Sequence, residues 1–231
     1  PSPPQPTSSA PAPAIVDAQA EMRAAIIAAA EAAVSAAAPT HRTAAVDALP
    51  LPGLRTVTPR LAFHGLVSGG DTTGSFMGEG IDPVREAAIM RSIRIVRGRN
   101  LQAADEQAAI LGAGLAANVG AKPGDRIVLL ATSAAGGLGA VELEVAGLFA
   151  TTAKAYDDAA LRVPIEVARK LKGVDGATSW VVLLEDTRDT GAAVARLRAG
   201  LAPDGFEVVP WHDLADFYNK TVELFTRQVG V

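Results

Sequence analysis

The stretch at residues 108–130, AAILGAGLAANVGAKPGDRIVLL, constrains the fold most, because only a short glycine-bounded segment separates its two apolar runs. Gly120 is expected to end a helix of about two turns, since glycine is the usual residue after a helix C-terminus. The Lys-Pro-Gly-Asp sequence that follows is typical of a tight turn. The β-branched and leucine residues at 126–130 then predict a strand.

Three residues of this stretch also match a dinucleotide-binding pattern. Gly112, Gly114 and Ala117 fit G-x-G-x-x-G/A, in which a helix N-terminus holds a pyrophosphate. That site requires a parallel strand–helix–strand crossover of at least about a dozen residues. The helix here ends by Gly120, about six residues before the next strand. The spacing therefore favours a purely structural role for the glycines.

Composition narrows the classes of function. The chain has 231 residues, of which 49% are hydrophobic but only 4% aromatic, so its core must consist mainly of Ala, Val, Leu and Ile. The net charge of −4 gives nucleic-acid binding no electrostatic support. The chain has no cysteine, which excludes disulfides, thiol nucleophiles and thiolate metal sites. No apolar run approaches the length of a membrane span, and no signal peptide is visible, so we expect a fragment of a longer protein.

The middle of the chain predicts mostly strands. Alternating residues at 54–67 and 75–81 indicate a hairpin around a turn at 68–74. Further strands are expected at residues 140–149 and 160–164, with a loop at 157–158 and short helices at 43–49, 86–89 and 165–171. The last third predicts a strand–helix–strand unit: a buried strand at 178–184, a helix at 190–201 and a return strand at 206–210.

Both ends of the chain read differently from the middle. Residues 1–14 are rich in proline and serine and predict an extended tether. Residues 15–39 and 211–231 predict amphipathic helices. The first is open to two interpretations, a helix packed on a sheet or a stalk rising from a membrane. The second helix is the candidate coupling helix, and its apolar face comprises Trp211, Leu214, Phe217, Tyr218 and Phe225.

No catalytic motif emerges. The chain lacks a P-loop, an H-E-x-x-H motif and a G-x-S-x-G elbow. His41, His64 and His212 have no ligand spacing, and Glu142 and Glu144 alternate as residues on one solvent face of a strand do. The arginines at 91, 94, 97 and 99 indicate a partly solvated strand more than an anion site. We therefore expect no catalytic, cofactor-binding or metal-binding residues, and an enzyme is the weakest class.

The order of the motifs resembles a known family, the MacB-like periplasmic core domain of FtsX-like ABC transporter permeases, in particular the lipoprotein-releasing LolC/LolE type. No single motif is specific, but their order and spacing together are. The matching pieces lie at residues 80–83 (GIDP), 98–101 (GRNL), 110–116 (ILGAGLA), 120–127 (GAKPGDRI), 145–149 (VAGLF), 163–164 (VP) and 211–218 (WHDLADFY).

The resemblance implies an α+β fold. A porter-like α/β subdomain at residues 40–97 and 160–210 is interrupted by a β-rich, sabre-like insertion at 98–159, with stalk helices at 15–39 and 211–231. It also implies a periplasmic domain of an inner-membrane protein. The expected partners are a cytoplasmic ATP-binding subunit, a second permease copy or paralogue, a periplasmic carrier or adaptor, and lipid or lipoprotein cargo.

The resemblance further implies a mechanical function, in which ATP-driven motion passes through the stalk helices to lipoprotein, lipid, peptide or drug cargo. The glycine-rich tip at residues 132–139 matches the position of the long hairpin with which one lipoprotein-releasing subunit binds its carrier protein. Its candidate partner-contact residues are Thr132, Gly136, Gly137 and Gly139. The alternative is a free-standing periplasmic binding module for a ligand or protein. Hydrophobic segments flanking residues 1–231 in the full gene would favour the first hypothesis.

Overall fold

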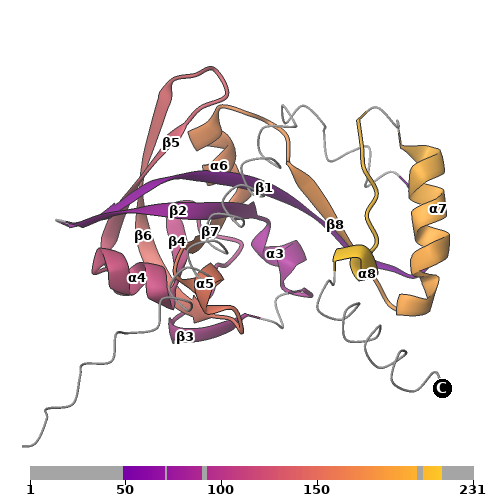
Figure 1. The fold of residues 1–231 in the computed structure, drawn as a ribbon, viewed down its shortest axis with the longest axis horizontal. Helices are drawn as coiled ribbons and strands as arrows, with labels where there is room; N and C mark the ends of the chain where they lie inside the picture. The colour runs from indigo at the N-terminus through magenta and orange to yellow at the C-terminus, as the bar shows by residue number, and fades with distance from the viewer. Residues whose placement is uncertain (1–48, 71, 90–92, 202–204, 215–231) are drawn as a thin grey trace, which may run out of the picture. The chain divides into compact units, whose positions relative to one another are not determined.

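The computed structural model describes residues 49–70, 72–89, 93–201 and 205–214 (Figure 1). The chain divides into two compact units, Pro1–Ala38 and Pro39–Val231, and all described residues belong to the second. The predicted tether at 1–14, the helix at 15–39 and most of the short helix at 43–49 lie outside the described residues. The fold that follows is therefore that of the second unit alone.

Strands dominate the described fold. In chain order the elements are β1 (Leu54–Gly69), β2 (Thr72–Ile81), α3 (Pro83–Glu86), β3 (Arg94–Gly98), β4 (Ala108–Gly112), α4 (Ala113–Val119), β5 (Arg126–Thr132), β6 (Leu138–Ala150), α5 (Lys154–Asp157), β7 (Ala160–Pro164), α6 (Ile165–Lys172), β8 (Ser179–Leu184), η2 (Thr187–Asp189), α7 (Thr190–Gly200) and α8 (Trp211–Leu214).

All eight strands form one mixed sheet, in the order β2-β7-β4-β6-β5-β1-β8, with β3 paired to β6. Because β2 also pairs with β1, the six strands β2, β7, β4, β6, β5 and β1 form a closed ring of pairings. Strand β8 lies outside this ring and pairs with β1. The pairs β2–β7 and β4–β6 are parallel, and the other pairs are antiparallel. Strands from residues 40–97, 98–159 and 160–210 thus share one sheet, and the porter–sabre division stays a prediction.

Strands β2, β4, β6 and β7 contribute to two cores, because successive side chains point to opposite faces of a sheet. In β7, Leu161 and Val163 belong to the larger core, whereas Ala160 belongs to the smaller one. The larger core also takes the buried faces of α4 and α6, and Phe63 packs edge-on against Phe76 there, with ring centroids 5.5 Å apart. Aliphatic residues fill the rest, as the low aromatic content predicts.

The stretch at 108–130 folds as β4, α4 and β5, and Gly120 ends α4 with a left-handed φ of 70°. Because β4 runs parallel to β6 and β5 antiparallel to it, β4 and β5 do not form a parallel crossover. A Cβ on Gly112 or Gly114 would overlap Asp157 or Asp158 at the end of α5. Close packing against α5 therefore explains the two glycines.

Other predictions were wrong in detail. The β1–β2 hairpin forms as expected, but its strands extend to Gly69 and from Thr72, which leaves a tighter turn than predicted. A short helix, α5, replaces part of the loop expected near residues 157–158. The strand β8 lies at the sheet edge and is half-buried rather than buried. Residues 206–210 form no strand, so the return strand of the predicted strand–helix–strand unit is missing.

Candidate functional site

The leading segment, residues 49–53, reaches β1 along the β8–α7 part of the fold. The backbone N–H of Glu185, just after β8, donates to the Gly53 carbonyl at 2.8 Å. The guanidinium of Arg196 on α7 lies 3.4 Å from the Pro50 carbonyl oxygen. Leu49 packs so closely on the end of α7 that a Cβ on Gly200 would come within 2.6 Å of its methyl group. The chain thus enters the sheet in contact with α7.

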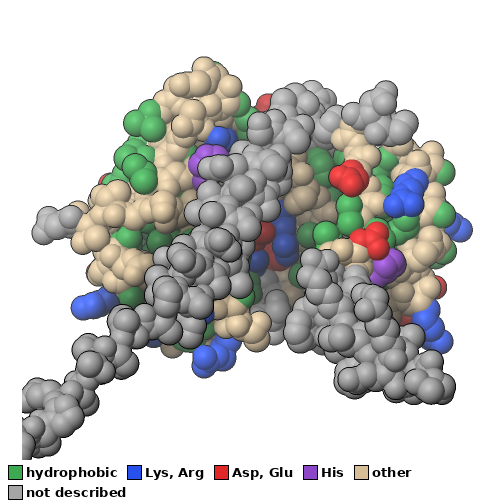
Figure 2. Space-filling model, in the orientation of Figure 1, with side chains coloured by type: hydrophobic (Ala, Val, Ile, Leu, Met, Phe, Trp, Pro, Cys, Tyr) green, Lys and Arg blue, Asp and Glu red, His purple; other side chains and the backbone are tan. Residues whose placement is uncertain are grey.

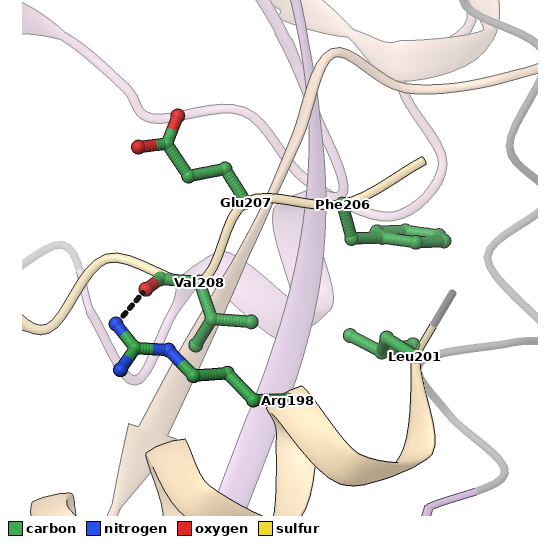
Figure 3. Close-up of a pocket in the computed structure, with 5 residues that line it drawn as sticks. All are labelled: Arg198, Leu201, Phe206, Glu207 and Val208. Atoms are coloured by element: carbon green, nitrogen blue, oxygen red, sulfur yellow. Dashed lines mark hydrogen bonds between the residues drawn. The ribbon is translucent and has the colours of Figure 1, made fainter. Parts of the chain in front are cut away.

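The trailing segment, residues 206–210, leaves along the same unit. The Arg198 guanidinium of α7 donates to the Val208 carbonyl at 3.0 Å. The Phe206 ring lies beside Trp180 of β8, with centroids 5.6 Å apart. Leu201, Phe206, Glu207 and Val208 line a cavity of about 370 Å³ with Arg198 (Figure 3). Both segments that flank the described fold are therefore attached to β8 and α7.

Only the first turn of the candidate coupling helix is described, as α8. Trp211 and Leu214 are 49% and 73% exposed, and the Trp211 ring packs edge-on against His212. The other members of the predicted face, Phe217, Tyr218 and Phe225, lie outside the described residues. The described part of this helix therefore presents apolar side chains at the surface.

The candidate partner-contact loop is an ordered hairpin tip between β5 and β6. The Lys172 ammonium at the end of α6 donates to the Thr132 carbonyl, and the Ala134 N–H donates to the Lys172 carbonyl at 2.9 Å. Burial lowers the pKa of Lys172. Gly136 takes a φ of 82°, which favours glycine. Of the other predicted residues, Gly137 lies in the tip and Gly139 in β6, where it pairs with Ala131. The tip is thus fastened to α6.

The surface beside this tip is apolar. Leu138 is 74% exposed and Val128 38% exposed, and Leu66 of β1 is 47% exposed opposite Leu130 of β5. Figure 2 shows hydrophobic side chains together over the β5–β6 part of this face. The sequence pattern did not predict this apolar surface, because Leu66 and Val128 are neighbours only through the pairing of β1 with β5.

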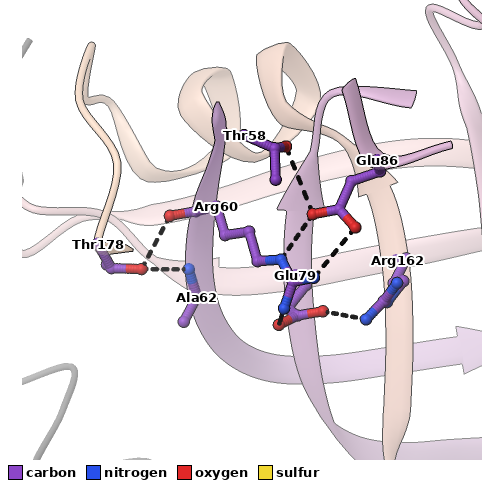
Figure 4. Close-up of polar contacts among 7 residues, drawn as sticks. All are labelled: Thr58, Arg60, Ala62, Glu79, Glu86, Arg162 and Thr178. Atoms are coloured by element: carbon purple, nitrogen blue, oxygen red, sulfur yellow. Dashed lines mark hydrogen bonds and ion pairs between the residues drawn. The ribbon is translucent and has the colours of Figure 1, made fainter. Parts of the chain in front are cut away.

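A network of buried and half-buried charges, also missed from the sequence, joins β1, β2, β7 and α3 (Figure 4). Glu86 at the end of α3 is fully buried and accepts hydrogen bonds from Arg60 Nε and Nη2 at 2.6 and 3.0 Å. Thr58 donates to the same carboxylate at 3.4 Å. Across the sheet, Glu79 lies 3.5 Å from Arg60 and 2.7 Å from Arg162. Positive and negative side chains therefore alternate over three neighbouring strands.

Local sequence explains how this network is positioned. Asp82 caps α3 by accepting from the backbone N–H groups of Val84 and Arg85, and Pro83 opens the helix. The Gly-Ile-Asp-Pro motif thus brings Glu86 under β1. Burial alone lowers the pKa of Arg60. The hydrogen bond with Glu86 and the charges of Glu79 and Glu86 together raise it by more, so the net shift of the pKa is upward. Burial also raises the pKa of Tyr156 on α5, beside the network.

The remaining predicted polar groups stay apart. Arg94 and Arg97 are exposed on β3, as a solvated strand predicts, whereas Arg99 forms a two-point ion pair with Asp105 at 2.6 and 2.8 Å. Glu142 faces solvent and pairs with Arg126. His64 and His212 lie on separate elements, and Arg91 and His41 fall outside the described residues. Among the described residues, no group of three His, Asp or Glu side chains is arranged to hold a metal.

The helices that the structure describes lack the length and hydropathy needed to span a bilayer. Residues 7–199 match the family model of the MacB-like periplasmic core domain. No curated protein matches the sequence.

Two solved structures share the fold. The extracellular domain of the noncanonic ABC-type transporter YknZ from Gram-positive bacteria superposes with a TM-score of 0.55 at 13% identity, over 72% of this chain and 86% of that one. The periplasmic region of MacB from Actinobacillus actinomycetemcomitans gives 0.54 at 14% identity, over 80% of this chain and 90% of that one.

Proposed function

Because this chain belongs to the family of MacB-like periplasmic core domains, we propose that it is the extracytoplasmic domain of an ABC transporter permease and passes ATP-driven motion to the transported cargo. A cytoplasmic ATP-binding subunit would supply the motion, and a second permease copy or paralogue would complete the transporter. We place the domain on the periplasmic side of an inner membrane. The described residues contribute mechanical coupling to this function.

The attachment of both flanking segments to β8 and α7 supports the proposal. Residues 49–53 are tied to this unit through Glu185 and Arg196, and residues 206–210 through Arg198 and Trp180. A displacement applied at either end would therefore act on the same elements. From there the antiparallel β1–β8 ladder, which runs from Leu54↔Leu184 to Arg60↔Ser179, carries the load into the sheet.

The charge network supplies the next connection. Arg60 stands at the end of the β1–β8 ladder and binds Glu86 of α3 and Glu79 of β2. Motion of β1 is thus coupled to β2, and through Arg162 to β7. Buried ion pairs of this kind are costly to break once formed, so they resist sliding between the strands.

For the cargo, we propose a lipoprotein, lipid, peptide or drug, and the lipoprotein-releasing type is the version that the sequence motifs favour. The β5–β6 tip, with exposed Leu138 and an apolar surface beside it, is the proposed contact for a periplasmic carrier or adaptor. The tip is short and fastened to Lys172, so it would offer a rigid contact surface rather than a long hook.

The test uses the intact permease that contains this chain, reconstituted with its ATP-binding subunit. Arg198→Met keeps the aliphatic stem but removes the hydrogen bond to Val208, so we expect ATP hydrolysis to continue while cargo release falls. Arg94→Met is the matched control, because Arg94 is an exposed arginine on β3. Unchanged release in Arg198→Met would contradict mechanical coupling through α7.

Membrane fractionation of the full-length protein separates the proposal from the free-standing alternative. A permease domain stays with the membrane after a high-salt wash. Recovery of the full-length protein among freely soluble periplasmic proteins would instead favour a binding module.

A further inference from the structure

The trailing segment has the composition of a strand and lies beside β8, but it forms no strand ladder with β8. Its residues 206–210 read FEVVP, rich in the aromatic and β-branched types that favour strands. Figure 1 shows the segment running beside β8 in the same direction, after the chain has returned through α7. The Phe206–Trp180 ring contact confirms that the two lie side by side. The segment nevertheless forms no strand.

Within the described residues, the edge of β8 that faces away from β1 carries no paired strand. Among the strands that the structure describes, β8 stands last in the order and pairs with β1 alone. On the same strand, the Trp180 indole Nε1–H is buried and has no acceptor among the described residues. A buried donor without a partner is costly, so an acceptor brought to this indole would stabilise the fold.

We propose that residues 206–209 reversibly join the edge of β8 as a parallel strand, forming a latch at the C-terminal end of the described fold. The chain would then complete a β8–α7–strand crossover, the connection that parallel strands require. Pro210 marks the end of the latch, because proline has no N–H to donate to a strand ladder. The use of this latch in transport rests on the proposed function, whereas its existence does not.

The ring contact sets the expected register. Trp180 and Phe206 lie on the same side, so Val182 would stand beside Val208, two residues further along each strand. Glu207 would point to the opposite face. A latched segment therefore makes a specific prediction about which side chains can be joined.

Engineered disulfides test this register in the chain itself, which has no cysteine of its own. In Val182→Cys/Val208→Cys the two Cβ atoms face the same way, so mild oxidation should cross-link them at least about tenfold faster than in the control Val182→Cys/Glu207→Cys. Circular dichroism of the reduced variants establishes that both are folded. Equal rates, or a faster control, would overturn the proposal.

Hydrogen exchange of the unsubstituted chain provides a second readout. Reversible pairing predicts that some amides of residues 207–209 exchange about 10- to 100-fold more slowly than in an unstructured peptide, yet faster than the β1 amides paired with β2. Unprotected amides would mean that no latch forms, and protection equal to that of β1 would mean a permanent strand. Both measurements are independent of transport, so their failure is distinct from failure of the proposed function.

Discussion

The buried carboxylate of Glu86 offers the sharpest test of the fold. It is fully buried, and its two hydrogen bonds to Arg60 measure 2.6 and 3.0 Å. Glu86→Ala would leave the Arg60 guanidinium, whose side chain is only 20% exposed, without its main counter-charge. Removing one partner of a buried ion pair typically costs about 3–5 kcal/mol.

The lower end of that range is expected here, because Glu79 still lies 3.5 Å from Arg60. A loss of about 3 kcal/mol is a large part of the roughly 5–15 kcal/mol that stabilises a typical domain. For a domain of this size, about 2–4 °C of melting temperature correspond to 1 kcal/mol, so Tm should fall by about 6–12 °C. Glu86→Gln keeps the shape but not the charge and should lose about 1.5–3 kcal/mol.

Urea denaturation followed by circular dichroism measures these free energies of unfolding. The matched control is Glu166→Ala, since Glu166 also pairs with an arginine, Arg169 at 2.8 Å, but is 77% exposed. A surface pair of this kind should contribute less than about 1 kcal/mol. If Glu86→Ala were no more destabilising than this control, the ion pair with Arg60 would not hold α3 against β1.

Four further predictions concern three single sites and nucleotide binding. The hydrogen bonds from Arg99 hold the pKa of Asp105 below its ordinary 3.8, so the ion pair stabilises the fold above that value and is lost as pH falls through the lowered pKa. The stability advantage over Asp105→Asn should therefore be present at pH 7 and shrink below pH 3.8 in acid titrations of unfolding. Gly112→Ala should destabilise by about 1–3 kcal/mol through its overlap with Asp157, and thermal shift should show no NAD(P)-dependent rise in the unsubstituted chain. Gly191→Ala on α7 meets no atom within 4 Å and should instead stabilise by about 0.4–1 kcal/mol; a loss of stability there would show that α7 is packed differently.

Local features of this fold were predictable because their signals lie within a few residues. Gly120 and Gly173 end α4 and α6 in the left-handed conformation that only glycine adopts easily. The short spacing between Gly120 and β5 correctly predicted that β4 and β5 are not joined by a parallel crossover. The alternating strands and the β1–β2 hairpin followed from the same short-range patterns.

Features that depend on the pairing order were not predictable. Thr178 and Arg60 are 118 residues apart in the chain but share a hydrogen bond across the β1–β8 ladder. Glu86 reads as an ordinary charged residue in a short helix, and only the arrangement of β1 over α3 reveals its burial. The strand predicted at 206–210 had the right composition, but composition does not determine whether the edge of β8 is occupied.

The two ends of the described fold are held unequally, which bears on how motion would enter it. The leading segment continues directly into β1, whose ladders join it to β2, β5 and β8. The trailing segment is held by the Arg198–Val208 hydrogen bond and the Phe206–Trp180 ring contact, with no strand ladder. Its attachment should therefore yield at smaller loads than that of β1. In the proposed transporter, motion reaching both ends would displace the trailing segment first, and completion of the latch on β8 would make the C-terminal attachment comparable to the N-terminal one.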